Sequence, residues 1–323
     1  MVLLIYLVNG GRMSVYSNFT VSLDNPNSSW TIVYNAIADN STILDIGCSS
    51  GYFDKILIDQ KKCIVDGIEL DKDDYEKAKK ICRAMWHGNI EDNLFPWELI
   101  SDKYDHILFI DVLEHLLDPS EALKKCARFL KPNGSIIFSI PNMGNGTVRL
   151  ELLTGGFTYQ SDGLLDATHL HYYTGSTIQS MIDRSGLRLS SIDYTTFNTP
   201  KVIIDKILGG VGLDNTEAFT RFINSDDSLV YQYVGQITTT GKSVKIIEQN
   251  GSVKPKIDYD KQLADIKKEA SRQFKQKVER DQTIAEKDIE ISELNKVIDM
   301  HNKKFHHKLA RKISEKTRQF FKP

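Results

Sequence analysis

Short apolar runs alternate along the chain with amphipathic stretches of helical length. The runs are rich in Ile, Val, Leu and Phe without polar alternation, which is typical of strands buried on both faces. They are Ile43–Ile46, Cys63–Leu70, Ile107–Val112 and Ser135–Ile140. The stretches between them are Gly51–Gln60, Lys72–Trp86 and Ser120–Leu130. This alternation predicts an α/β protein with a doubly wound, mostly parallel sheet.

The pattern changes after Asn142. A loop-rich stretch leads to a predicted helix at 176–185 and a predicted strand at 187–197. Residues 201–228 have helical periodicity, and 229–240 alternate like a strand. Because the two late strands lack the spacing of a parallel crossover, we expect them to form an antiparallel hairpin at one edge of the sheet.

A long C-terminal helix is predicted over residues 258–323, which contain no glycine and whose one proline is Pro323. Apolar positions from Ile284 to Phe305 fit a heptad repeat and predict a coiled coil. The expected organisation is an N-terminal leader, a main domain, a linker and this helix. Their expected bounds are 1–29, 30–244, 245–257 and 258–323.

Charge is balanced over the whole chain, with a formal net charge of −2, so no nucleic-acid partner is expected. The exception is 301–323, which carries eight basic residues against a single acidic residue, Glu315. A basic helix with one apolar face could contact an anionic membrane surface. Self-association through the coiled coil, a separate partner and a merely solvated helix stay open as alternatives.

The cysteines and the N-terminus bear on the compartment. No pair among the four cysteines has C-x-x-C spacing, which argues against a zinc knuckle or a redox dithiol. The apolar run Val2–Val8 is far shorter than the roughly 20 residues of a membrane span, and it lacks a charged start. We expect a cytoplasmic protein, with a peripheral position at the inner face of the cytoplasmic membrane as an alternative. Whether Met1 or Met13 is the true start stays open.

The most informative segment joins the first predicted strand to the first helix, Ile43 to Phe53. Gly47 and Gly51 allow a sharp turn and let bare backbone approach a ligand at the helix N-terminus. A dinucleotide fingerprint G-x-G-x-x-G does not fit, because Ser49 stands where its second glycine would be. Asp45 followed by small residues at 47, 49 and 51 instead resembles motif I of the class I S-adenosylmethionine-dependent methyltransferases.

Further motifs of that superfamily follow in order. Glu69 ends the second predicted strand, where a carboxylate can bind both ribose hydroxyls. Asn89 and Ile90 resemble the adenine-binding position, and 109–116 and 130–134 resemble motifs IV and V. The resemblance covers about 30–200 and implies a Rossmann-like fold with S-adenosyl-L-methionine as cofactor. The predicted cofactor-binding residues are Asp45, Gly47, Ser49, Gly51, Glu69, Leu70, Asn89, Ile90, Asp111 and Val112.

Residues 163–174 crowd two histidines, two tyrosines and an aspartate together. They are similar to a block in bacterial methyltransferases of cell-surface polysaccharide and lipopolysaccharide assembly, with His171 where an arginine is usual. The resemblance implies O-methylation of a sugar hydroxyl of a surface glycan or its lipid-linked precursor. His169 is the predicted general base, with Asp166 as the residue that orients its imidazole. The alternative role for His169 is to fix the fold through backbone hydrogen bonds.

Two rival functions stay open. Glu114 and His115 resemble a metal-binding element of small-RNA 2′-O-methyltransferases, with Asp111 and either His169 or His171 as further ligands. That favours an RNA or small-molecule methyltransferase with metal assistance, although metal-free relatives share the stretch, and we expect no metal. The other rival is a non-catalytic cofactor-binding scaffold organised by the coiled coil.

Overall fold

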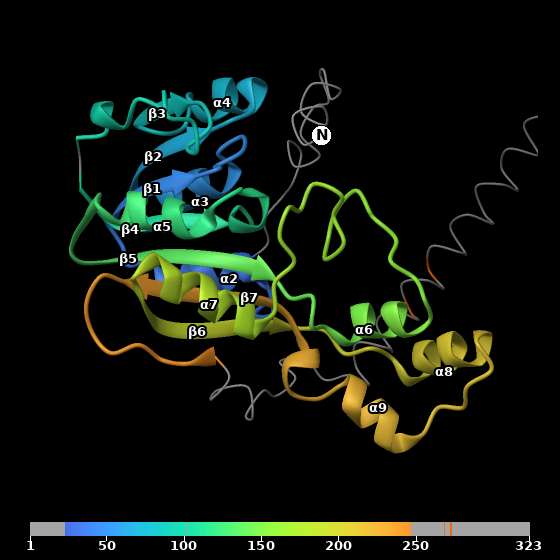
Figure 1. Ribbon diagram of the computed structural model, residues 1–323. Coiled ribbons are helices and arrows are strands. Elements are labelled where there is room, and N and C mark those ends of the chain that lie inside the picture. Colours follow the sequence, from blue (N-terminus) through green and yellow to red (C-terminus); the bar gives the residue numbers. More distant parts are fainter. Residues whose placement is uncertain (1–22, 102, 247–267, 269–271, 273–323) are drawn as a thin grey trace, which may run out of the picture. The chain divides into compact units, whose positions relative to one another are not determined.

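The computed structural model describes residues 23–101 and 103–246, together with 268 and 272. Its centre is a seven-stranded sheet in the order β3-β2-β1-β4-β5-β7-β6 (Figure 1). The strands are β1 Thr42–Ile46, β2 Ile64–Glu69, β3 Ala84–His87, β4 Tyr104–Ile110, β5 Leu130–Pro141, β6 Arg188–Thr196 and β7 Val230–Thr238. The predicted mixed α/β architecture is confirmed.

The sheet reverses direction once. Strands β1 to β5 pair in parallel, whereas β7 runs antiparallel to both β5 and β6. The two late strands therefore pair at the edge as the sequence predicts. They do not form a tight hairpin, because helices α8 (Lys201–Gly210) and α9 (Glu217–Ile223) lie between them in the chain.

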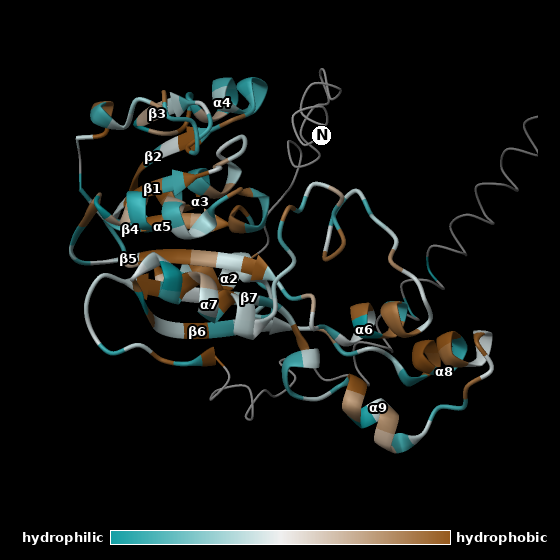
Figure 2. Ribbon diagram, in the orientation of Figure 1, coloured by the Kyte–Doolittle hydropathy of each residue, from teal (hydrophilic) through white to brown (hydrophobic). Residues whose placement is uncertain are grey.

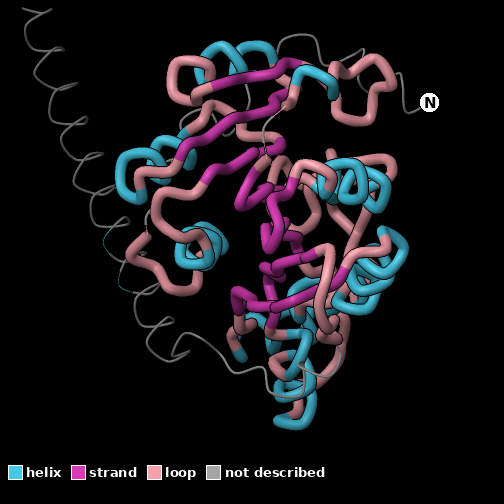
Figure 3. The backbone as a smooth tube through the Cα atoms, turned by 90° about the vertical axis from the view of Figure 1, so that its left-hand side faces the viewer, coloured by secondary structure: helices cyan, strands magenta, loops and turns pink. Residues whose placement is uncertain are grey.

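Helices cover both faces of the sheet (Figure 3). Successive strand residues point to opposite faces. Ile43 accordingly packs with α2 and α3, while Leu44 packs with α5 and α7. These helices are α2 Ser29–Ala36, α3 Tyr52–Lys61, α5 Pro119–Ala127 and α7 Gly175–Ser185. Burial on both sides explains why these strand segments are mostly apolar.

Two predicted helices end earlier than their periodicity suggested. The helix expected over 72–86 ends as α4, Lys72–Ala78, and the chain then enters the short strand β3. β3 pairs only with β2 and is partly exposed, so its four residues carry no buried-strand pattern. The helical stretch 201–228 breaks after α8, where Gly212 adopts φ +75.

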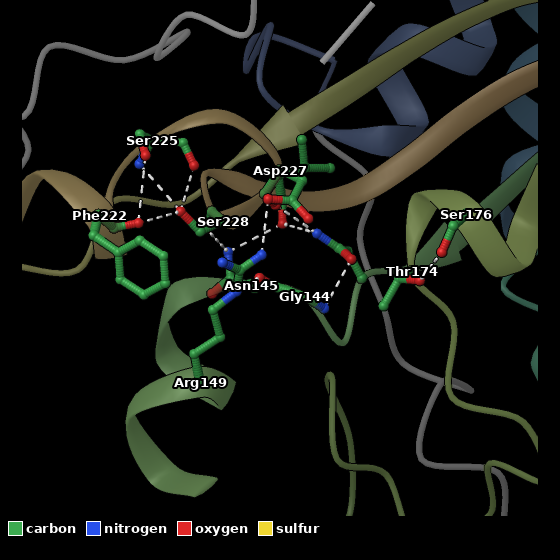
Figure 4. Close-up of polar contacts among 11 residues, drawn as sticks. Gly144, Asn145, Arg149, Thr174, Ser176, Phe222, Ser225, Asp227 and Ser228 are labelled. Atoms are coloured by element: carbon green, nitrogen blue, oxygen red, sulfur yellow. Dashed lines mark hydrogen bonds and ion pairs between the residues drawn. The ribbon is translucent and has the colours of Figure 1, made fainter. Parts of the chain in front are cut away.

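A small subdomain is built from α6 (Gly146–Leu153), α8 and α9. It has its own apolar cluster of Leu150, Ile204, Leu208 and Ile223, and Figure 2 shows hydrophobic residues along all three helices. Asn145 ties α6 to the start of β7, because its Nδ2 donates to the carbonyls of Ser228 and Val230, 3.1 Å away in each case. Arg149 adds an ion pair of 2.8 Å with Asp227, which belongs to the 3₁₀ helix η3 (Asp226–Ser228) (Figure 4).

Gly235 on β7 offers a test of core packing. A Cβ at this position would collide with the ring of Phe138 on β5. We expect Gly235→Ala to lower the free energy of unfolding by about 1–3 kcal/mol, the usual cost of overpacking. The matched control is Gly209→Ala in α8, where a Cβ meets nothing within 4 Å and should leave stability equal or slightly higher. Urea unfolding of both variants measures the difference, and equal stability of the two would contradict the packing.

Several predictions lie outside the described residues: positions 1–22 of the leader expected over 1–29, most of the linker, and nearly all of the C-terminal coiled coil with its basic end. The expected domain bounds therefore stay predictions. Among the helices that the structure describes, none combines the length and apolar character needed to cross a membrane.

Candidate functional site

Two adjoining hollows lie at the carboxyl ends of β1, β2 and β4, where open α/β sheets bind ligands. The larger, a cavity of about 450 Å³, includes Asp45, Gly47, Ser49, Asp111 and His169 in its lining. The smaller, about 120 Å³, is lined among others by Gly47, Glu69, Leu70, Asn89, Ile90 and Val112. Gly47 and His115 line both. The structure thus brings nearly all of the predicted cofactor-binding residues to one crevice.

The turn after β1 needs its glycines for different reasons. Gly47 has φ +74, and a Cβ there would come within 2.7 Å of Val112 Cγ2. Gly51 has φ +76 and packs against α4, where its Cβ would lie 3.2 Å from Ala78 Cα. Gly51 lines neither hollow, so the structure gives it a packing position behind the turn rather than a place beside a ligand.

The Glu69 carboxylate is held in place by backbone donors. Oε2 accepts from Ser49 N and Oε1 accepts from Asp71 N, both at 2.7 Å. Burial raises the pKa of Glu69, and these backbone hydrogen bonds oppose the rise. The Ser49 hydroxyl is engaged elsewhere, because it donates to Asp74 Oδ2 at 3.0 Å. Each Glu69 oxygen has a further lone pair that could accept from a ligand hydroxyl, and Glu69 lines the smaller hollow.

Buried carboxyls make the crevice floor suited to a cation. Burial, and next the neighbouring Asp54, hold the pKa of Asp45 well above its usual range. Burial raises the pKa of Asp54, a residue that sequence reasoning missed, to about 6. With Glu69 and Asp111 nearby, a positively charged ligand would stabilise the ionised forms. The sulfonium and ammonium groups of S-adenosylmethionine meet that requirement, so the residues present fit the cofactor.

Asp111 follows β4 in the left-handed region, with φ +53. Its Oδ1 accepts from Ser139 Oγ at 2.7 Å and from Gln232 Nε2 at 3.0 Å. Gln232 lies on β7 and lines the larger cavity together with Trp30 and Tyr231. Sequence reasoning missed all three, because no local motif marks them. Only the packing of α2 and β7 against the rest of the sheet brings them to the cavity.

One wall of the larger cavity is formed where 163–174 docks on η2, the 3₁₀ helix Leu113–His115. The Glu114 carbonyl accepts from Leu170 N at 2.9 Å and His171 N at 3.0 Å. This docking brings His169 into the wall of the larger cavity beside Glu114 and His115. Burial, followed by the nearby His115, lowers the pKa of His169 to about 4, which keeps its imidazole unprotonated at neutral pH.

Asp166 has a different partner from the one predicted. Its Oδ1 accepts from Thr168 N at 2.7 Å and from Thr168 Oγ1 at 2.6 Å. The Asp166 charge acts on the His169 imidazole only at a distance, where it raises the pKa of that histidine against the effect of burial. The aspartate therefore shapes the loop that carries His169, rather than bonding the ring itself.

The reversed seventh strand and the crevice at the carboxyl ends are those of the class I S-adenosylmethionine-dependent methyltransferases. The chain belongs to the methyltransferase domain family, whose profile matches residues 30–192, half of its length.

Similar curated proteins include two ubiquinone biosynthesis O-methyltransferases. That of Bordetella avium is 28% identical over 167 residues, covering 48% of this chain and 66% of that protein. That of Idiomarina loihiensis is 27% identical over 168 residues, covering 49% and 66%. The chain thus spans just under two thirds of the length of these relatives. A solved SAM dependent methyltransferase from Aquifex aeolicus has a TM-score of 0.42 at 12% identity, covering 68% of this chain and 95% of that one.

Proposed function

We propose that the protein transfers a methyl group from S-adenosylmethionine to a hydroxyl of a sugar, in a surface glycan or its lipid-linked precursor. The observation that supports methyl transfer is the crevice at the carboxyl ends of three neighbouring strands. Gly47, Glu69 and Asp111 lie there, at the ends of β1, β2 and β4. Family membership and the curated O-methyltransferases support it further. The sugar acceptor is supported by the block at 163–174 alone.

The cofactor would be held by residues of both hollows. Glu69 would bind the ribose hydroxyls, since its carboxylate is already fixed by two backbone donors. Asn89 would meet the adenine edge and Ile90 its face in the smaller hollow. Asp45 and Asp111 would face the positively charged methionine portion in the larger one. When bound, the cofactor supplies a methyl group on a sulfonium, which is a good leaving group.

His169 would accept the proton of the acceptor hydroxyl as the oxygen attacks. Its position in the cavity wall and its unprotonated state suit this role. Because the displacement is in-line with a good leaving group, alignment by the cavity walls supplies most of the rate. A base adds to it only when the acceptor is a hydroxyl.

The curated relatives favour a second acceptor. Both take part in ubiquinone biosynthesis, so a hydroxyl on a ubiquinone precursor is the alternative. Either lipid-linked acceptor is compatible with a membrane contact of the basic segment 301–323, or with its self-association at the membrane.

An isotope assay tests the activity and separates the acceptors. The full-length protein is incubated with S-adenosylmethionine labelled in its methyl group and with host membranes, which are then separated into glycan and lipid-quinone fractions. We expect label in the glycan fraction, at least tenfold above a reaction with the cofactor-binding variant Gly47→Asp. Label confined to the quinone fraction would refute the sugar acceptor and support the ubiquinone precursor instead. Label in neither fraction, nor in a parallel reaction with total host RNA and small molecules, would contradict the proposed activity.

A further inference from the structure

Glu114 is the most unusual polar group near the crevice. Its side chain is 1% exposed, and within the described residues neither carboxylate oxygen has a hydrogen-bond partner. An unpartnered buried carboxyl costs free energy that folding normally avoids. Glu114 lines the larger cavity, so a group that entered the cavity could partner it.

Two imidazoles lie beside this carboxyl. His169 Nε2 is 4.0 Å from Glu114 Oε1, which is too long for a hydrogen bond. The rings of His115 and His169 are T-shaped with centroids 4.9 Å apart. One ligand atom from each of the three residues lies within 4.8 Å of the others. The three groups therefore lie close enough together for one ion to reach all of them, and the distance between His169 and Glu114 excludes a hydrogen bond between those two.

The chemistry of the trio specifies the missing partner. Two imidazole nitrogens and one carboxylate oxygen are a ligand set for Zn²⁺ and related divalent transition metals, which leaves further coordination positions open. Ligand atoms around a tetrahedral Zn²⁺ are about 3.4 Å apart, given metal–ligand distances of about 2.1 Å. Side-chain rotations that move each atom by about an ångström would close the trio around an ion.

A second layer of contacts already orients one ligand. His115 Nδ1 lies 3.2 Å from the Thr168 carbonyl and 3.3 Å from Thr168 Oγ1. Thr168 Oγ1 in turn donates to the buried Asp166. A carboxylate-supported chain that fixes an imidazole by its second nitrogen is the usual outer shell of metal-binding histidines. In this arrangement the two hydrogen bonds between Thr168 and Asp166 would help to hold His115 in position.

We propose that Glu114, His115 and His169 bind one divalent transition-metal ion in the wall of the larger cavity. All three residues line the larger cavity, so an acceptor that entered it could take a coordination position that they leave open. An acceptor hydroxyl bound there would lose its proton to solvent water more readily, because the ion lowers its pKa. The metal site stands on its own geometry, whereas this role in catalysis rests on the proposed function and would replace the task of His169 as base.

Co²⁺ binding to the metal-stripped full-length chain tests the site, because Co²⁺ bound to imidazole and carboxylate absorbs visible light. His306 and His307 in the C-terminal segment are first replaced by asparagine, since adjacent histidines can bind metal themselves. We expect one Co²⁺ per chain, displaced by Zn²⁺. Absence of a stoichiometric visible spectrum would overturn the site.

Single variants assign the ligands. In the same background, Glu114→Gln, His115→Asn and His169→Asn should each weaken Co²⁺ binding at least about tenfold, as losses of ligand or outer-shell groups do. His171→Asn is the matched control, because it lies two residues from His169, hydrogen-bonds the Leu117 carbonyl and stands outside the trio. Circular dichroism checks folding, and a variant that fails to fold is replaced by Glu114→Asp. Equal binding by the control and the trio variants would overturn the assignment.

The outcome is separable from that of the proposed function. Metal-free protein should still bind S-adenosylmethionine, because none of the predicted cofactor-binding residues belongs to the trio. If methyl transfer persisted in the presence of a chelator and Co²⁺ did not bind, the metal site would be refuted and His169 would stay the proposed base. If Co²⁺ bound but S-adenosylmethionine did not, the proposed methyltransferase activity would be refuted and the metal site would stand.

Discussion

The Gly47→Asp variant is expected to lose S-adenosylmethionine affinity by about 100-fold or more, equivalent to roughly 2.7 kcal/mol. A side chain at this position would begin 2.7 Å from Val112 Cγ2 and would project where both hollows meet. The left-handed φ of +74 adds backbone strain. Calorimetric titration of the full-length chain with the cofactor measures the loss.

The control is Gly186→Asp. Gly186 has a nearly identical φ of +76 at the end of α7, but a Cβ there meets nothing within 4 Å. It therefore carries the backbone strain without filling the crevice, and its cofactor affinity should stay within twofold of that of the unaltered protein. Equal loss in both variants would mean that strain alone lowers the affinity. Equal retention would refute the place of Gly47 beside the cofactor.

His169→Ala is expected to lower kcat for methyl transfer by about 10²–10⁴-fold, the usual contribution of a positioned acid–base group. Cofactor affinity should change less than twofold, because His169 comes from the loop 163–174 and not from the strand ends that carry Gly47 and Glu69. Rates are measured with the labelled cofactor and the membrane acceptor fraction, and affinity by calorimetry.

His171→Ala serves as the comparison for turnover. Its imidazole bonds the Leu117 carbonyl at 3.3 Å and lies outside the larger cavity. It should retain kcat to within about threefold, since one weak, partly exposed hydrogen bond is lost. If His169→Ala kept full turnover, the histidine would have a structural role only, which is the alternative that the sequence left open.

The sheet was largely predictable because its strands are buried on both faces. Burial demands continuous apolar runs such as 43–46, which local sequence displays directly. β3 lacked that signal, since an edge strand of four half-exposed residues needs no apolar run. The end of α4 was missed for a related reason: Ile81 and Cys82 keep helical spacing after the helix has ended at Ala78.

The candidate site divides in the same way. The crevice around Gly47 and Glu69 could be predicted because its chemistry resides in short motifs at strand ends. The hydrogen-bond partners of Asp111 and His115 could not, because they arise from contacts between distant parts of the chain. Gln232 reaches Asp111 across 121 positions, and His115 meets Thr168 across 53. Asp54 was hidden because a carboxylate in the first turn of a predicted helix is ordinary in sequence, and only the structure shows that Asp54 and Asp45 are both buried.

The subdomain of α6, α8 and α9 has a consequence for how this protein can diverge. Its cluster of apolar residues is separate from the two clusters that flank the sheet. All three helices of the subdomain follow β5 in the sequence. Changes in these helices and in the neighbouring loop can accumulate while the strands that bear Gly47 and Glu69 stay intact. The crevice at the strand ends can therefore stay unchanged while the subdomain varies, because none of its three helices lines either hollow.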